Sequence, residues 1–350
     1  MAAANPLLVI AGPTASGKSA LSLSCARHLH AEILSVDSVQ IYRGLDIGSA
    51  KLTLAQREGV PHHLLDIREP DAAFNVADFL REAEASISDI QGRGKSCVVC
   101  AGTTLYLTAL LHGLVESPSQ DLVYRASLEG RPSEDLHEAL ARLDPVSAQK
   151  LHPRDRVRLV RALEVAHLTG KAPSLLQSEH AYRTTKHAAL ILVLCWNRKD
   201  LYARINQRSQ LMLEQGLVEE TRALCQRFPE AKQALRTLGY AQAMDFLAGK
   251  LPEERLCEEI AMQTRRYAKR QMTYWRNEPA KRGWQQRPTP EEAAMEIDAL
   301  SPAPRGKSLK CMRVLSLSVP DLLVAAERRI STLQEEIELW YVDAAALLAA

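Results

Sequence analysis

The residues from Gly12 to Ser19 have the composition and spacing of a phosphate-binding loop. They read Gly12-Pro13-Thr14-Ala15-Ser16-Gly17-Lys18-Ser19, a complete G-x-x-x-x-G-K-S motif. The two glycines let backbone N–H groups turn toward an anion, Lys18 adds a point charge, and the Ser19 hydroxyl can hold Mg²⁺. A glycine-rich turn without a ligand is the alternative. The apolar run before the loop, 7–11, and the helical pattern after it favour a phosphorylated ligand.

Two further apolar runs, 33–36 and 97–101, end in polar residues. Asp37-Ser38-Val39-Gln40 follows the first run, and Gly102-Thr103-Thr104 follows the second. If these runs are parallel strands, their carboxyl ends meet the phosphate loop in one crevice. Asp37 is then a carboxylate at that crevice, able to accept a proton from a substrate. For an isolated aspartate, an Asx turn or a helix cap is the alternative role.

The elements that must position these residues alternate between strand and helix. Apolar runs at 7–11, 33–36, 97–101 and 190–196 are separated by helical patterns such as 75–91. This alternation predicts an α/β fold, a P-loop NTPase-like parallel sheet with helices on both faces. Between 113 and 186 the strand signal disappears and helical patterns replace it. We therefore expect an α-helical insertion domain between two strands of the sheet.

Composition limits the classes of protein that fit. The chain has 350 residues, 46% hydrophobic and 25% charged, with a formal net charge of +2, which is typical of a globular protein. No apolar run approaches the roughly 20 residues that a membrane span needs, so we expect no membrane contact. Seven scattered cysteines favour reduced thiols, and the N-terminus lacks the features of a signal peptide. We expect a cytoplasmic monomer.

Two short groups of residues resemble metal or redox motifs. Cys97 and Cys100 have C-x-x-C spacing, and His62 and His63 are adjacent. The cysteine pair lies in an apolar strand pattern, and no second Cys/His pair stands near either group. We therefore expect buried thiols and structural histidine hydrogen bonds, with a metal or redox site as the alternative.

Two basic clusters favour a nucleic-acid partner. Residues 150–186 contain eight Lys/Arg against three Asp/Glu, a local charge of +5. Residues 265–287 contain eight Lys/Arg and one acidic residue, with two tyrosines and two tryptophans interleaved. Basic and aromatic side chains together suit phosphate contacts and base stacking. Either cluster alone is also explained by a solvated helix face with its aromatics packed inward.

The chain resembles the tRNA dimethylallyltransferases, also called isopentenyl-diphosphate:tRNA transferases. The matching segments lie at 12–19, 37–51, 61–67, 102–106, 152–164, 238–240 and 264–276. The most diagnostic is Asp-Ser-Val-Gln-Ile-Tyr-Arg-Gly-Leu-Asp-Ile-Gly-Ser-Ala-Lys at 37–51, because ordinary P-loop kinases lack it. The others include Pro-His-His-Leu-Leu-Asp-Ile at 61–67 and the Arg-rich segment at 264–276.

The resemblance implies a reaction and the residues that perform it. A dimethylallyl group passes from dimethylallyl diphosphate to N6 of adenosine 37, immediately 3′ of the anticodon, and diphosphate leaves. The phosphate loop then holds the diphosphate of the prenyl donor together with Mg²⁺, and Asp37 is the general base. Thr103 and Arg208 are further contacts of the diphosphate. For Arg208, a structural ion pair on a helix is the alternative.

The resemblance also implies contacts with the anticodon loop of tRNA. Ser38, Val39 and Gln40 line the adenine beside Asp37 and Thr103. The other implied tRNA contacts are Arg125, Val157, Arg158, Leu159, Val160, Arg161, Arg236, Thr237, Leu238, Gly239, Tyr240 and Ala241.

The chain departs from the family's pattern in two places. Ala101-Gly102-Thr103-Thr104 stands where the family usually has Gly-Gly-Thr-Gly, and nothing beyond about 287 matches. We therefore expect a P-loop core at 1–113 and 188–287, a helical tRNA-binding insertion at 114–187, and a linker with an appended helical tail at 288–350. Apolar residues at helical spacing predict one helix over 320–348, loosely tethered and not needed for the chemistry.

Two other function classes remain open from the residues. One is a small-molecule enzyme, either an ATP-binding P-loop kinase or a prenyltransferase acting on free adenine nucleotides. The other is an RNA-binding module without catalysis. The basic clusters argue against the first class, and the intact set of Lys18, Ser19, Asp37 and Thr103 argues against the second.

Overall fold

The computed structural model describes residues 5–114, 118, 120–180, 184–286, 300–301, 314–315, 318–333 and 336–349. The chain divides into two compact units. The first comprises 1–111 and 185–350, and the second, which we call the insertion unit, comprises 112–184. Within the described residues, no helix is long and apolar enough to cross a membrane.

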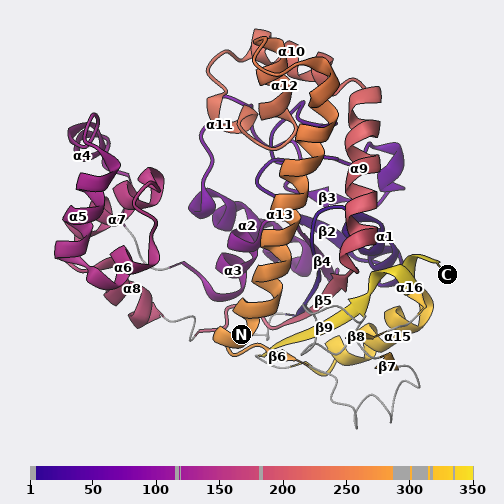
Figure 1. Cartoon of the computed structure of the whole chain (residues 1–350). Helices are drawn as coiled ribbons and strands as arrows, with labels where there is room; N and C mark the ends of the chain where they lie inside the picture. The colour runs from indigo at the N-terminus through magenta and orange to yellow at the C-terminus, as the bar shows by residue number, and fades with distance from the viewer. Residues whose placement is uncertain are drawn as a thin grey trace. The chain divides into compact units, whose positions relative to one another are not determined.

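The first unit is built on one sheet, in the order β3-β2-β4-β1-β5-β9-β8-β7, with β6 paired to β9 (Figure 1). The central strand β1 pairs in parallel with β4 on one side and with β5 on the other. Only the short β7–β8 pair is antiparallel among the described strands. The strands are β1 Leu7–Ala11, β2 Glu32–Val36, β3 His62–His63, β4 Cys97–Ala101, β5 Ala189–Cys195, β6 Gln285–Gln286, β7 Leu300–Ser301, β8 Val314–Leu315 and β9 Ile337–Asp343.

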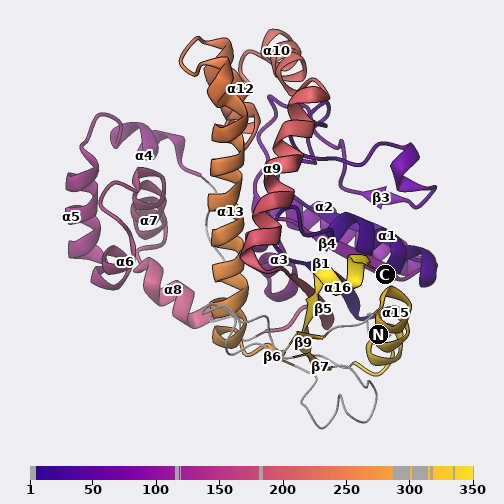
Figure 2. The same ribbon diagram turned by 45° about the vertical axis from the view of Figure 1, so that its right-hand side comes forward.

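Helices cover both faces of this sheet, so β1 is buried along its whole length (Figures 1 and 2). Alternate residues point to opposite layers, as in any strand. Leu7 and Val9 pack in one layer with α2 and α3, whereas Leu8 and Ile10 pack in the other with α1 and α15. The expectation of an α/β fold with a two-sided parallel sheet is confirmed.

The helices of the first unit are α1 Lys18–His28, the 3-10 turn η1 Ala55–Arg57, α2 Val76–Gly92, α3 Thr104–His112, α9 Arg198–Glu214, α10 Leu217–Arg227, α11 Lys232–Leu235, α12 Tyr240–Leu247, α13 Glu253–Lys281, α15 Val319–Ile330 and α16 Ala344–Ala349. Helix α2 begins with a capping box, in which the Asn75 side chain accepts from the N–H of Asp78 and the Asp78 carboxylate accepts from the N–H of Asn75. Helix α13 crosses the carboxyl ends of the strands and reaches the phosphate loop and the loop after β4.

The insertion unit contains helices joined by turns, with no strand among its described residues. It contains α4 Leu122–Ser127, α5 Ser133–Leu143, α6 Pro145–Lys150, α7 Arg156–Thr169 and α8 Pro173–His180. Its own small core is formed by residues such as Leu136, Leu140 and Leu163. The Asp144 side chain joins two helices, because it accepts from the N–H of Ser147 at 3.0 Å and from the Ser174 hydroxyl at 2.7 Å.

The expectation of one loosely tethered helix over 320–348 is wrong. The helix α15 ends at Ile330, and the chain then enters β9, which pairs with β5 over seven residues, from Ala189↔Ile337 to Cys195↔Asp343. The residues of β9, Ile-Glu-Leu-Trp-Tyr-Val-Asp, are rich in the β-branched and aromatic types that favour strands. The apolar residues at helical spacing do lie on a helix as far as Ile330, the end of α15. The prediction continued the helix beyond that residue into the segment that forms β9. Much of 288–317 lies outside the described residues.

The stability of the protein should therefore depend on β9. We expect Leu339→Ala to lower the free energy of unfolding by about 2–5 kcal/mol, because Leu339 is 1% exposed and its loss leaves a cavity. The matched control is Val324→Ala on α15, where the side chain is 42% exposed and the cost is below about 1 kcal/mol. Urea denaturation measures both, and equal small effects would show that this segment does not belong to the core.

Candidate active site

The phosphate loop lies between β1 and α1, as its motif requires. Gly12 has a φ of +139°, and a Cβ at this position would come within 2.9 Å of the Leu194 carbonyl, so only glycine fits. Within the loop, the Lys18 ammonium donates to the Pro13 carbonyl at 2.9 Å. Two arginines of α9 contact the loop from outside: Arg208 donates to the Thr14 hydroxyl at 2.5 Å and Arg204 to the Ala15 carbonyl at 3.0 Å.

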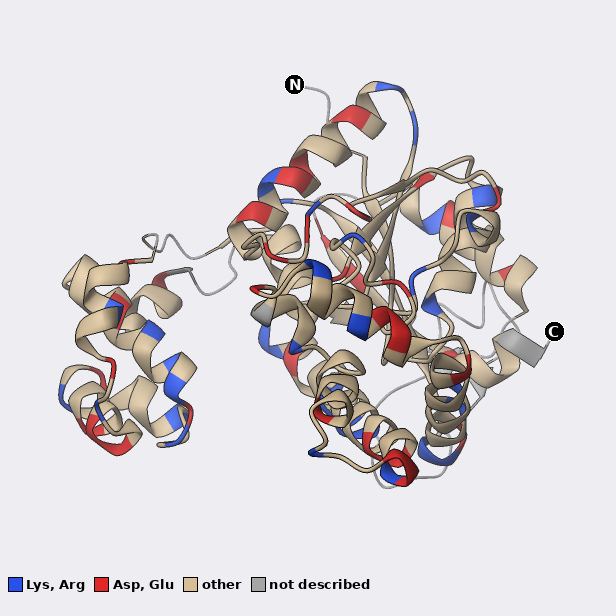
Figure 3. Cartoon of the chain, turned by 90° about the horizontal axis from the view of Figure 1, so that it is seen from above, with Lys and Arg blue, Asp and Glu red and all other residues tan. Residues whose placement is uncertain are grey.

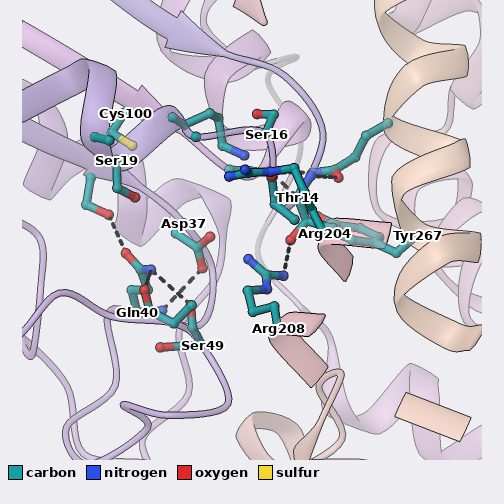
Figure 4. Close-up of a pocket in the computed structure, with 18 of the residues that line it drawn as sticks. Thr14, Ser16, Ser19, Asp37, Gln40, Ser49, Cys100, Arg204, Arg208 and Tyr267 are labelled. Atoms are coloured by element: carbon teal, nitrogen blue, oxygen red, sulfur yellow. Dashed lines mark hydrogen bonds between the residues drawn. The ribbon is translucent and has the colours of Figure 1, made fainter. Parts of the chain in front are cut away.

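The side chains of Lys18, Arg204 and Arg208 line a cavity of about 410 Å³ beside this loop (Figure 4). The first cavity, as we call it, is lined by the loop from Thr14 to Ser19 and by Ser35, Asp37, Gln40, Ser49, Cys100, Gly102, Arg204, Arg208, Tyr267 and Gln271. Burial lowers the pKa of Lys18 to about 8 and that of Arg208 to about 10. An anion in this cavity would offset the cost of holding these charges away from water.

Asp37 directly follows β2, and its carboxylate faces the first cavity. One carboxylate oxygen, Oδ1, accepts from the N–H of Val39 at 2.8 Å and of Gln40 at 3.2 Å, which is an Asx-type turn. The other, Oδ2, lies beside Gly102, where a Cβ would approach it to 2.3 Å. Turn formation and a role toward a substrate are therefore compatible, since each uses a different oxygen.

Thr103 joins the ends of β2 and β4. Its hydroxyl oxygen accepts from the N–H of Ser38 at 3.0 Å, and its own N–H donates to the Val36 carbonyl at 2.9 Å. Gln40 extends the same network, because its side-chain amide donates to the Ser49 carbonyl at 3.1 Å. The segments at 37–40 and 102–103 thus meet the phosphate loop in one crevice, as the sequence predicted.

Sequence reasoning did not single out Gln271, which holds two of these loops together. From α13, its side-chain oxygen accepts from the N–H of Thr14 at 2.8 Å, and its side-chain nitrogen donates to the Gly102 carbonyl at 3.0 Å. The side chain is buried. The only sequence signal near Gln271 is the basic and aromatic composition of 265–287. That composition indicated nucleic-acid binding and not a contact with the phosphate loop.

A second cavity of about 410 Å³ shares Thr14, Asp37, Ser49, Arg208 and Tyr267 with the first. Its other lining residues include Ser38, Val39, Thr103, Arg236, Thr237, Leu238, Gly239, Ala241, Gln242 and Arg270. Most of the predicted tRNA contacts of the first unit therefore gather at one cavity. The Arg270 guanidinium lies 5.7 Å from the centre of the Tyr267 ring, which is a cation–π distance. Asp37 is positioned where the two cavities meet.

Two of the predicted tRNA contacts need correction. Tyr240 is fully buried and its hydroxyl donates to the Glu220 carboxylate at 2.7 Å. Leu159 is fully buried in the core of the insertion unit. Neither side chain offers a surface to RNA, because the helix face on which each residue lies packs inward.

The predicted arginines of the insertion unit differ in their surroundings. Arg125 and Arg161 both donate to Glu164, at 2.7 and 2.5 Å, and this carboxylate is fully buried. Those ion pairs lower the pKa of Glu164 to about 2. By contrast, the Arg158 side chain is 68% exposed, beside Asp155, and Val157 is 81% exposed. Figure 3 shows residues of both charge signs on the helices of this unit.

The other motifs of the sequence have structural partners. His63 is 2.7 Å from a carboxylate oxygen of Glu32, and His62 is 2.8 Å from the Val60 carbonyl. Cys97 lies inside β4, where burial raises its pKa to about 12.

The residues around the loop fit a magnesium ion held together with phosphate oxygens. Mg²⁺ prefers hard oxygen ligands and keeps several waters. The first cavity offers the Ser19 hydroxyl and the Asp37 carboxylate as such donors. Among the described residues there is no cluster of three or more His, Cys, Asp or Glu that would hold a metal without a ligand's help.

Comparisons with known proteins decide the family. The model of the IPP transferase family matches residues 40–278. The chain belongs to this family. The tRNA dimethylallyltransferase 1 of Citrifermentans bemidjiense is 45% identical over 273 residues, 78% of this chain and 89% of that protein. The tRNA dimethylallyltransferase of Anaeromyxobacter sp. (strain Fw109-5) is 47% identical over 280 residues, 78% of this chain and 92% of that protein.

Solved structures agree with this assignment to the IPP transferase family. The full-length tRNA isopentenylpyrophosphate transferase of Bacillus halodurans has a TM-score of 0.58 and 36% identity, covering 78% of this chain and 88% of that one. A eukaryotic dimethylallyltransferase described as acting on tRNA has a TM-score of 0.69 and 30% identity, covering 79% of this chain and 71% of that one.

The lowered pKa of Lys18 predicts a pH dependence of diphosphate binding. Below about 8 the ammonium is charged; as the pH rises through that value the charge is lost, and affinity for an alkyl diphosphate falls. The binding constant should be measured between about pH 7.5 and 9.5. Above the pKa of Lys18, it should fall by up to about tenfold per pH unit. The ligand's own ionisation does not explain such a decline, since a phosphate's second pKa is about 6.

Isothermal titration calorimetry with dimethylallyl diphosphate measures this effect. The matched control is Lys18→Arg, because the guanidinium keeps its charge over the whole range and its profile should be flat. A wild-type profile as flat as that of the arginine variant would contradict the role given to Lys18.

Proposed function

We propose that this protein transfers the dimethylallyl group of dimethylallyl diphosphate to N6 of adenosine 37 in tRNA and releases diphosphate. The observation that carries the proposal is the position of Asp37, between a cavity lined by the phosphate loop and a cavity lined by 236–239 and Arg270. One carboxylate thus faces both a place for a prenyl diphosphate and a place for a nucleobase. We further propose that the protein acts as a cytoplasmic monomer.

The first cavity suits the prenyl donor. Lys18, Arg208 and the loop N–H groups place positive charge where the leaving diphosphate gains negative charge. Mg²⁺, held by Ser19 and the phosphate oxygens, would add further positive charge to the leaving group when bound. Thr103 fixes the ends of β2 and β4 and lines the second cavity together with Asp37, and we propose that it contacts the diphosphate where the two cavities meet.

The second cavity suits the acceptor base. The adenine N6 attacks the first carbon of the prenyl group, so that a C–N bond forms while the C–O bond to diphosphate breaks and diphosphate leaves with the electron pair. The N6 proton passes to the Oδ2 oxygen of Asp37, which no N–H of the turn occupies. Ser38 and Val39 lie beside this carboxylate and would contact the base.

An adenine reaches such a cavity only after it leaves the stack of the anticodon loop, which costs a few kcal/mol. Tyr267 and the cations Arg236 and Arg270 line the second cavity, and they can offset this cost by stacking and phosphate contacts. In the insertion unit, we propose that Arg158 contacts tRNA phosphates directly. Arg125 and Arg161 act there by neutralising the buried Glu164.

The general-base role of Asp37 is tested by Asp37→Asn. The amide keeps an oxygen for the N–H groups of Val39 and Gln40 and therefore preserves the turn, but it cannot take up a proton. We expect the rate of prenyl transfer to fall by about 10²–10⁴-fold while affinities for donor and tRNA stay near those of the wild type. Single-turnover transfer of labelled donor measures the rate, and a value within threefold of wild type would refute the role.

A pair of glycine variants controls for general effects of mutation. Gly102→Ala places a Cβ against Oδ2 of Asp37, so the same rate should fall with the carboxylate still present. Gly92→Ala adds a Cβ that meets nothing within 4 Å and should leave the rate unchanged.

A further inference from the structure

Helix α13 contains a proline near its end and continues past it. Pro279 lies inside the helix, which ends at Lys281. Proline has no N–H, so it cannot donate to the carbonyl of Trp275, four residues earlier. The Trp275 side chain is buried, and its carbonyl therefore needs another donor away from water.

The C-terminal strand β9 supplies that donor. The Tyr341 hydroxyl donates to the Trp275 carbonyl at 2.7 Å, and the bond is buried. Tyr341 is held firmly, because its strand pairs with β5 through Val193↔Tyr341. The chain after α13 also joins this strand, since β6 pairs with β9 through Gln285↔Glu338. The end of α13 and β9 lie side by side in Figures 1 and 2.

One turn before Trp275, the same helix carries Gln271, which contacts Thr14 of the phosphate loop and Gly102 beside Asp37. Any shift of α13 along or about its axis moves this side chain relative to both loops. The family model ends at residue 278, before Pro279 and before β9. The family model therefore does not cover this connection.

We propose that Tyr341 is a positioning residue for the transfer reaction. Its hydroxyl replaces the hydrogen bond that Pro279 removes, fixes the end of α13, and thereby sets the position of Gln271 between the phosphate loop and Gly102. The C-terminal segment is on this account part of the active architecture. The inference rests on the proposed function only where kcat/KM is measured. Binding of the diphosphate and hydrogen exchange of the helix test the role of Tyr341 without any transfer to tRNA.

The experiment is a double-mutant cycle of Tyr341→Phe and Pro279→Ala in the full-length chain. Tyr341→Phe should weaken binding of dimethylallyl diphosphate and lower kcat/KM by about tenfold each, the loss expected for one buried hydrogen bond. Alanine at 279 restores an N–H that can donate to the Trp275 carbonyl. In that background Tyr341→Phe should change either quantity by less than about twofold, because the hydroxyl is no longer needed.

Two further measurements separate positioning from general stability. The backbone amides of 264–276 should exchange hydrogen faster in Tyr341→Phe, and not in the double variant. The control Trp340→Phe alters the preceding residue of β9, whose side chain packs in the opposite layer of the sheet from Tyr341. It should lower the melting temperature while leaving donor affinity within about twofold.

If Pro279→Ala does not fold, the cycle is run with Gln271→Leu instead, and Tyr341→Phe should then add no further loss of donor affinity. Equal effects of Tyr341→Phe in both backgrounds would overturn the proposal, as would a lower melting temperature with unchanged donor affinity and exchange. If donor binding follows the cycle but no prenyl group reaches tRNA, the positioning role stands and the proposed function fails.

Discussion

The geometry of the site depends on the two hydrogen bonds of the Gln271 side chain. A primary amide has both an acceptor and a donor, so one residue can hold an N–H of the phosphate loop and the carbonyl of Gly102 at the same time. These two loops follow strands β1 and β4, which are neighbours in the sheet. Because the side chain is buried, loss of its oxygen would take the hydrogen-bond acceptor from the N–H of Thr14. Loss of its NH₂ group would leave the Gly102 carbonyl with only the 3.5 Å hydrogen bond from the Tyr267 hydroxyl.

The parallel sheet supplies the second constraint. Strands β2, β4 and β1 end at the same edge, so their loops bring Asp37, Thr103 and Lys18 together although these residues are far apart in the sequence. Gly102 completes this arrangement because the absence of a Cβ leaves room for the Asp37 carboxylate. The Ala101-Gly102-Thr103-Thr104 segment departs from the family pattern around this glycine but keeps the glycine and the threonine that the geometry uses.

The parts of the site that were predictable from sequence are local. The phosphate loop is a continuous motif, and Asp37 and Thr103 each follow an apolar strand directly. Gln271 was not predictable, since its partners lie 257 and 169 residues away in the sequence. The ion pair of Arg125 with the buried Glu164 was not predictable for the same reason, since 39 residues separate the two. Arg161 lies only three residues before Glu164, but local sequence does not show that this carboxylate is buried. The resemblance implies tRNA contacts for both arginines. The C-terminal strand was mistaken for helix because its pairing with β5 outweighs local periodicity.

In the proposed function, one crevice brings a prenyl diphosphate and an adenine together beside Asp37. Mass spectrometry of nucleosides from tRNA incubated with the protein, Mg²⁺ and dimethylallyl diphosphate tests it most directly. With wild-type protein, adenosine 37 should gain one dimethylallyl group. Free AMP should gain none under the same conditions. Modification of AMP as readily as of tRNA, or no modified nucleoside with correctly folded protein, would contradict the proposed transfer to tRNA.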